Sequence, residues 1–107
     1  MKASVINLVL DIHQRYDLQI DTSNSGIQYN GVDIYVNAYD KSKDLVATRM
    51  VFCGEYVGCS VLYRRGSEMH YDVSFESKTY AEFSSLYERA FDDISKGKTT
   101  QDMLRGL

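Results

Sequence analysis

One stretch decides the fold of this chain: residues 77–97, with the sequence SKTYAEFSSLYERAFDDISKG. Its apolar residues recur at steps of three and four, which places them on one stripe of a helix. Thr79 and Glu82 have the spacing of a capping box, and Gly97 stands where a residue with left-handed backbone commonly ends a helix. We therefore predict an amphipathic helix whose buried stripe consists of Tyr80, Phe83, Tyr87, Ala90, Phe91 and Ile94.

The residues before this helix predict a second helix and a series of strands. Apolar residues at helical intervals predict a helix over about 3–16, and alternation predicts short strands near 18–20 and 27–29. Asn30-Gly31 favours a type I′ hairpin turn. In the return strand we expect Val32, Ile34, Val36 and Ala38 to face the core and Tyr35 and Tyr39 to face outward.

Three further strands precede the C-terminal helix. Those expected at 45–53 and 56–65 carry apolar residues on both faces, which is typical of strands covered on both sides. The strand expected at 69–76 alternates Met69, Tyr71, Val73 and Phe75 with His70, Asp72, Ser74 and Glu76. It should therefore have one apolar and one acidic face.

Together these elements predict an α+β fold over a single domain, residues 1–107. An antiparallel sheet of four or five strands, arranged as a meander, packs against the N-terminal helix and the longer C-terminal helix. The order is α-β-β-β-β(-β)-α-α, in which the last, short helix spans about 99–104 and either forms or frays. A chain of 107 residues can build one hydrophobic core without a metal or a disulfide.

Charge is distributed unevenly along the chain. The net charge is −3, yet residues 66–95 carry seven acidic side chains against only Lys78 and Arg89. Such a concentration repels nucleic acid and steers a basic partner, so we expect no direct binding of DNA or RNA. The plain alternative is a solvated outer helix face.

No residue pattern has the spacing of a catalytic or metal site. His13 and His70 have no neighbouring nucleophile in a family pattern, and Cys53 and Cys59 lack the spacing of zinc ligands. We therefore predict a protein that is not an enzyme and holds no metal and no cofactor. A small hydrolase is the alternative, and it needs His70 and Ser74 to converge. The cysteines are expected to be buried thiols unless they face each other across the intervening bend.

What remains is a surface suited to protein binding. Nine of the thirteen aromatic residues are tyrosine, whose apolar ring and polar tip favour contact surfaces. Outward rings beside carboxylates would form an aromatic-anchored, negatively charged patch for a basic protein. The alternative is that these tyrosines complete the core. The predicted partner-binding residues are Tyr35, Tyr39, Tyr71, Asp72, Glu76, Glu82, Glu88, Asp92 and Asp93.

The chain shows no targeting segment in its sequence. The apolar run from Val5 to Leu10 contains Asn7 and is followed by Asp11, so it is too short for a signal-peptide core or a membrane span. We expect a cytoplasmic protein that does not bind membranes.

The N-terminal third resembles small phage-encoded anti-CRISPR proteins that inhibit type II RNA-guided nucleases. The resemblance rests on a helix with Leu8 and Ile12, a strand around Leu18-Gln19-Ile20, the loop Thr22-Ser23-Asn24-Ser25, the strand from Val32 to Val36 and an acidic α+β body. It implies a compact acidic protein that blocks the DNA-binding channel of an effector.

The functional hypothesis is therefore a non-enzymatic inhibitor, encoded by a phage or mobile element. It docks an acidic, tyrosine-bearing face on a basic partner surface, such as the nucleic-acid channel of a CRISPR effector nuclease. The alternative is an immunity or regulatory protein that binds a toxin, or itself as a homodimer, through the sheet face around Tyr35 and Tyr39. The oligomeric state is left open between monomer and homodimer.

Overall fold

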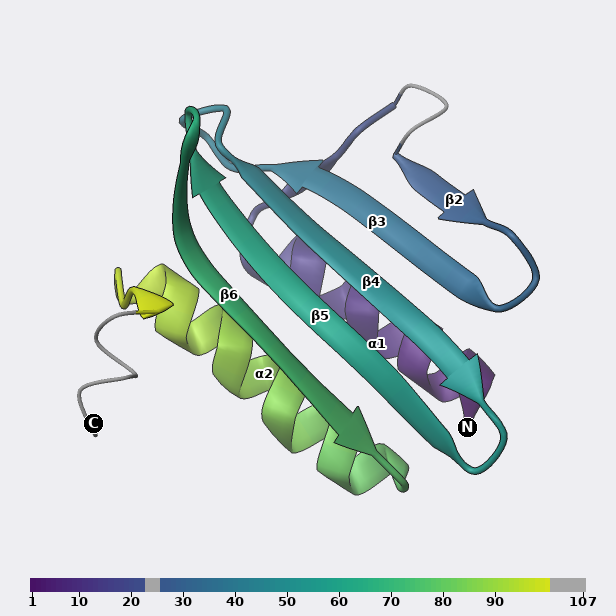
Figure 1. The fold of residues 1–107 in the computed structure, drawn as a ribbon. Coiled ribbons are helices and arrows are strands. Elements are labelled where there is room, and N and C mark those ends of the chain that lie inside the picture. The colour runs from purple at the N-terminus through teal and green to yellow at the C-terminus, as the bar shows by residue number, and fades with distance from the viewer. Residues whose placement is uncertain (23–25, 101–107) are drawn as a thin grey trace.

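The computed structural model describes residues 1–22 and 26–100 as two helices and six strands (Figure 1). The elements are α1 (Lys2–Arg15), β1 (Gln19–Ile20), β2 (Ile27–Tyr29), β3 (Asp33–Tyr39), β4 (Leu45–Cys53), β5 (Tyr56–Arg65), β6 (Glu68–Ser77) and α2 (Tyr80–Ser95). The predicted α+β fold, with its order of elements, is confirmed. The short helix predicted over 99–104 falls largely on residues 101–107, which lie outside the described residues.

All strand pairs in the sheet are antiparallel. Strands β3 to β6 form the predicted meander, in the order β1-β3-β4-β5-β6, and β2 pairs with the same edge of β3 as β1. The backbone of Asn37 joins the two short strands, because its carbonyl accepts from the Asp21 amide at 2.9 Å and its amide donates to the Gly26 carbonyl at 2.8 Å. A side chain at position 26 would collide with the carbonyl of Asp21, which accounts for the glycine.

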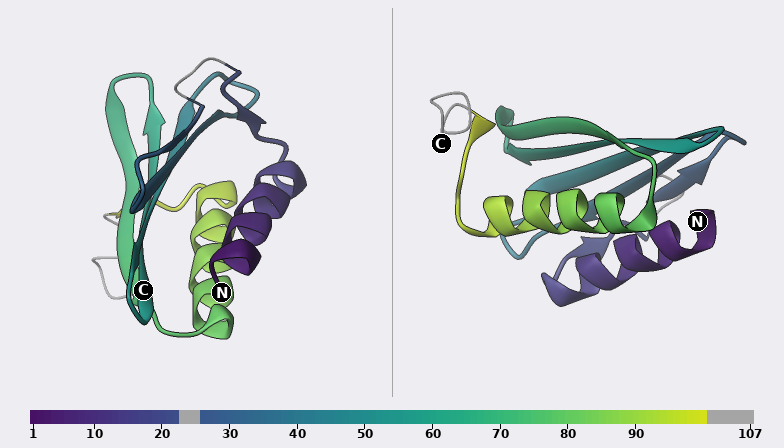
Figure 2. Two further views of the ribbon diagram at one scale, coloured as in Figure 1. Left: turned by 90° about the vertical axis from the view of Figure 1, so that its right-hand side faces the viewer. Right: turned by 90° about the horizontal axis from the view of Figure 1, so that it is seen from below.

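Both helices cover the same face of the sheet (Figure 2). The stripe of α2 supplies most of the aromatic core, as predicted. Phe83 stacks on Tyr87 with ring centroids 5.2 Å apart, Tyr87 contacts Phe91 at 4.8 Å, and all three rings are buried. Tyr80 departs from the prediction, because it is the first residue of α2 and remains 42% exposed beyond the end of the stripe.

The ends of α2 follow the sequence signals. The Glu82 amide donates to the Thr79 hydroxyl at 3.1 Å, which is the N-cap half of the predicted capping box. The Glu82 carboxylate lies 3.4 Å from the same hydroxyl. Gly97 has φ of +76°, the left-handed conformation expected just beyond the helix. These local signals position the helix along the chain and so fix which of its residues enter the core.

The expectation that β4 and β5 are covered on both sides is wrong. Along both strands, buried side chains alternate with half-buried or exposed ones, and the buried ones belong to the core that faces the helices. The opposite face of the sheet has no covering layer among the described residues (Figure 2). The outward residues Leu45, Ala47, Val51 and Leu62 are apolar but only half-buried, which is why their pattern resembled that of a central strand.

The hairpin between β2 and β3 is displaced by one residue from the prediction. The Asn30 amide donates to the Asp33 carbonyl at 3.1 Å, so the tip of the turn is Gly31-Val32. Gly31 has φ of +99°, and Asn30 is not left-handed, which differs from the type I′ turn expected. Val32 therefore lies in the turn at 55% exposure, although Ile34, Val36 and Ala38 are buried as predicted.

Candidate protein-binding face

The uncovered side of the sheet, here called the open face, is arranged in cross-strand rows. Strand pairing aligns Tyr35 with Arg49, Ser60 and Ser74 in one row, and Asp33 with Val51, Gly58 and Glu76 in the next. A third row aligns Asn37 with Ala47, Leu62 and Asp72, and a fourth places Tyr39 beside Leu45, which pairs in turn with Arg64. Because side chains in one row point to the same side, these residues form a continuous surface.

Arg49 contacts two neighbouring side chains at the centre of the open face. Its guanidinium forms an ion pair with Asp33 at 2.7 Å and lies 5.4 Å from the centroid of the Tyr35 ring. These contacts fix the Tyr35 ring against the sheet, and the predicted outward orientation of Tyr35 and Tyr39 is confirmed, with both rings half-buried. Sequence reasoning did not find Arg49, because its ion pair depends on the register between β3 and β4.

The acidic end of the open face is formed by β6. Asp72 and Glu76 point outward from this strand, are exposed, and form no ion pair with any residue in 1–22 or 26–100. About 13 Å of extended strand separates the two positions, since they are four residues apart. Ser74 lies between Asp72 and Glu76 on β6 and shares a cross-strand row with Tyr35 on β3. Three strand spacings, roughly 14 Å, separate these two row positions. Tyrosine and carboxylate therefore occupy opposite sides of one face.

The prediction that Tyr71 and Asp93 are available to a partner is corrected by the structure. Tyr71 is 1% exposed and Asp93 is 6% exposed, and the Tyr71 hydroxyl donates to the Asp93 carboxylate at 3.3 Å. Burial and the neighbouring carboxylate raise the pKa of Tyr71, which keeps the hydroxyl protonated as a donor. Lys98 lies 3.4 Å from the other Asp93 oxygen. This cluster ties α2 to β6 beneath the sheet.

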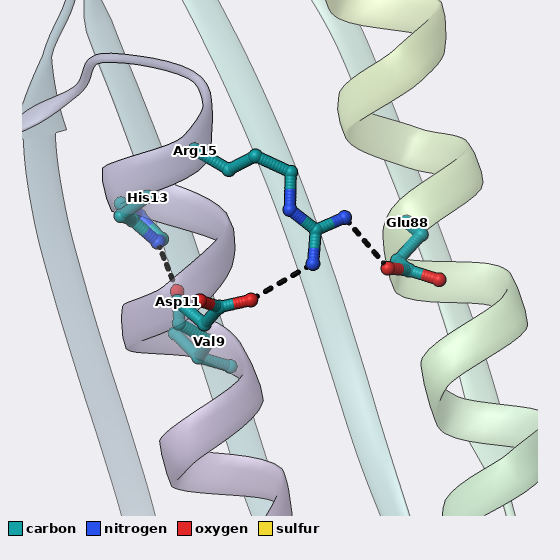
Figure 3. Close-up of polar contacts among 5 residues, drawn as sticks. All are labelled: Val9, Asp11, His13, Arg15 and Glu88. Carbon is teal, nitrogen blue, oxygen red and sulfur yellow. Dashed lines mark hydrogen bonds and ion pairs between the residues drawn. The ribbon is translucent and has the colours of Figure 1, made fainter.

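The remaining acidic residues of α2 lie in the helical layer, away from the open face. Glu88 forms an ion pair with Arg15 at 2.9 Å, and Arg15 also reaches Asp11 at 2.8 Å (Figure 3). Asp92 pairs with Lys96 at 2.9 Å. Glu82 is exposed, and its carboxylate contacts the hydroxyl of Thr79 at the start of the helix. The single patch predicted from Tyr35 to Asp93 is thus divided by the sheet, and only Tyr35, Tyr39, Asp72 and Glu76 share a face.

Within the part of the chain that the structure describes, the two histidines lie in separate surroundings, and neither is placed beside a nucleophile. His13 is buried against Phe91, and its Nδ1 donates to the Val9 carbonyl at 2.7 Å (Figure 3). Burial lowers the pKa of His13, which favours the neutral ring. His70 packs against Tyr63 with centroids 6.3 Å apart. Four residues of extended strand, roughly 13 Å, separate it from Ser74, so the convergence that a hydrolase would need is not formed.

The two cysteines point to opposite sides of the sheet. Cys59 is buried in the core, and burial raises its pKa, whereas Cys53 is exposed at the end of β4. The bend between β4 and β5 is Gly54-Glu55, and Cys53 pairs with Tyr56. The prediction of a buried thiol is therefore right for Cys59 and wrong for Cys53, and the geometry of a disulfide is not present.

Comparison with protein-family models, curated proteins and solved structures found no match to this chain. Among the described residues, no three histidine, cysteine or acidic side chains gather closely enough to hold a metal ion. Neither α1 nor α2 has the length and apolar character of a membrane-crossing helix.

Proposed function

We propose that this chain is a non-enzymatic, protein-binding inhibitor that docks on a basic partner surface through the open face and its acidic β6 side. The observation that supports this proposal most directly is that both helices pack on one side of the sheet (Figure 2). This leaves Tyr35 and Tyr39 half-buried on the other side, where Asp72 and Glu76 are exposed and form no ion pair with any of the described residues. Half-buried tyrosines supply contact area at small entropic cost, and carboxylates without ion pairs attract a basic partner.

The resemblance of the N-terminal third to anti-CRISPR proteins favours an RNA-guided nuclease as the partner. A nuclease guided by RNA holds nucleic acid in a positively charged channel. An acidic face that enters such a channel competes with DNA, which would make the chain an inhibitor of phage or mobile-element origin acting in the cytoplasm. Since Glu88, Asp92 and Asp93 are each paired with a basic side chain, the proposal now rests on Asp72 and Glu76.

A DNA-cleavage assay with a panel of type II RNA-guided nucleases tests the proposal. We expect the wild-type chain to inhibit at least one nuclease. The Asp72→Asn/Glu76→Gln variant should inhibit roughly 5- to 10-fold less well, because electrostatic steering is weakened. Asp11→Asn/Glu88→Gln is the matched control, with the same two isosteric changes placed in the helical layer. We expect this control to inhibit like the wild type.

Two results of this assay would contradict the proposal. Full cleavage by every nuclease in the presence of excess wild-type chain would remove the nuclease as partner. Equal loss of inhibition in the β6 variant and in the helical-layer control would show that overall charge, and not the open face, is responsible.

A second candidate is self-association through the open face. Leu45, Ala47 and Leu62 lie side by side on it and are half-buried. A second copy could cover this apolar area, as in a regulatory or toxin-binding homodimer. Light scattering over a range of concentrations separates the two candidates, because a monomer at every concentration removes the homodimer.

A further inference from the structure

We propose that the outer edge of β6 and the groove between β6 and α2 bind an extended peptide segment in which apolar and basic residues alternate. The segment would add to the sheet as a further strand. This inference rests on the proposed function, because it specifies which kind of segment in a basic partner binds to the acidic β6 side. It adds a site, the β6 edge, that the open face alone does not provide.

The backbone of β6 offers bonding groups on its outer edge. β6 is the last strand of the sheet, and β5 is its one strand neighbour among the described residues. The Asp72 amide points away from β5, because it donates to the Thr100 hydroxyl at 2.7 Å. Outward groups recur at every second residue of an antiparallel strand, so the amides and carbonyls of Ser74 and Glu76 point the same way. Thr100 already fills the position at Asp72, and from Ser74 onward no strand among residues 1–22 and 26–100 pairs with this edge.

A groove runs beside this edge on the side of the helices. It measures about 360 Å³ and is bounded by Val73 and Phe75 of β6 and by Leu86 and Ala90 of α2. Leu86 is 36% exposed although it belongs to the helix that supplies the core. An extended strand bound to β6 would direct every second side chain into this groove and the intervening ones over the open face. These four apolar lining residues favour valine or leucine in the groove.

Charge selects the residues at the intervening positions. Asp72 and Glu76 flank Ser74 on the open-face side of β6, so a neighbouring strand would gain from lysine or arginine opposite them. Arg89 also lines the groove, together with Lys98 and Asp93, which form an ion pair with each other. The remaining positive charge of Arg89 disfavours a basic residue pointing inward. The two sides of the edge thus specify an alternating apolar and basic pattern.

A second copy of this chain fits the edge poorly. Antiparallel pairing of two β6 strands about Ser74 would set Asp72 of one copy opposite Glu76 of the other, twice. Like charges directly opposite each other destabilise a strand pair. Acidic residues on an edge also protect a sheet from edge-to-edge association. The same carboxylates that oppose self-pairing favour a basic segment.

The test measures binding of a fluorescent peptide, KVKVKVKVK, by anisotropy. The control peptide, KKKKKVVVV, has the same composition and charge without the alternation. We expect the alternating peptide to bind at least about tenfold more tightly, since only it presents apolar residues to the groove and lysines to the carboxylates. Equal binding of the two peptides would overturn the inference and leave the electrostatic part of the proposed function intact.

Variants at Ser74 test the role of its amide. Ser74→Pro removes the outward N–H at an edge position, where proline is tolerated, and should weaken binding at least about tenfold. Ser74→Ala keeps the amide and removes only the hydroxyl bonded to Ser60 at 3.1 Å, so it should bind like the wild type. Binding by Ser74→Pro equal to that of Ser74→Ala would overturn the inference.

Peptide methylation on the wild-type protein gives an answer that does not depend on how the variants fold. In an added strand, only every second amide of the peptide points toward β6. One methylated peptide carries N-methyl groups on all lysine amides and a second on all valine amides. We expect one of the two to lose binding and the other to bind like the unmethylated peptide. Similar effects of both sets would overturn the inference. Peptide binding without any nuclease inhibition would instead remove the proposed inhibitor function and leave this site standing.

Discussion

Val61→Lys is expected to unfold most of the protein, whereas Leu62→Lys, one residue further along β5, should change the free energy of unfolding by less than about 1 kcal/mol. Val61 is 0% exposed and faces the helices, so a lysine there places an ammonium group in the core. That costs several kcal/mol, a large part of the roughly 5–15 kcal/mol that stabilises a small domain. Leu62 is half-buried on the open face and pairs with Asp72, where a lysine finds water and a carboxylate.

Urea unfolding followed by circular dichroism measures the two variants side by side. The pair is matched, because both substitutions introduce lysine into adjacent positions of the same strand. Equal and severe loss of stability in both would mean that a layer covers each face of the sheet. In that case the open face would not exist as a surface for a partner.

Tyr87→Ala is expected to cost about 3–5 kcal/mol of stability, as for other large buried aromatic residues. Tyr87 is fully buried, stacks with Phe83 and contacts Phe91. Its hydroxyl is 2.9 Å from that of Thr48 on β4, so the side chain joins α2 to the sheet. The truncation removes both the ring contacts and this hydrogen bond.

Three further variants separate these contributions in the same unfolding experiment. Tyr87→Phe should cost about 1–2 kcal/mol, because it leaves the buried Thr48 hydroxyl without its partner. Adding Thr48→Val to Tyr87→Phe should recover part of that loss. Leu86→Ala, at the exposed neighbour, should cost less than about 1 kcal/mol. A loss from Tyr87→Ala no larger than that from Leu86→Ala would contradict the packing of α2 on the sheet.

Local signals predicted most of the elements. The spacing of Phe83, Tyr87 and Phe91 located α2 and its buried stripe, and the capping box at Thr79 located its start, because both depend on residues within a few positions of each other. The same holds for the alternation in β3, which gave the outward orientation of Tyr35. The prediction that Val32 faces the core is wrong, because the hairpin turns at Gly31-Val32 and not at Asn30-Gly31. A one-residue shift of register makes this difference.

The candidate site was predicted less well, because it depends on contacts between distant segments. Val61 and Leu62 are both apolar, and no pattern in the neighbouring sequence indicates that the helices cover only the face of the sheet on which Val61 lies. The burial of Asp93 follows from its bond with Tyr71, 22 residues away, and Glu88 is paired by Arg15 across 73 residues. Asp72 and Glu76 were found because alternation along one strand is enough to place them outward.

Amide hydrogen exchange of the free protein, resolved by residue with NMR, tests most directly whether the outer edge of β6 is open to a partner. Val73 and Phe75 point their amides toward β5, and Ser74 and Glu76 point theirs outward. We predict strong protection of the first pair and fast exchange of the second, in strict alternation. Equal protection of all four amides would mean that the edge is already paired, and would contradict the account.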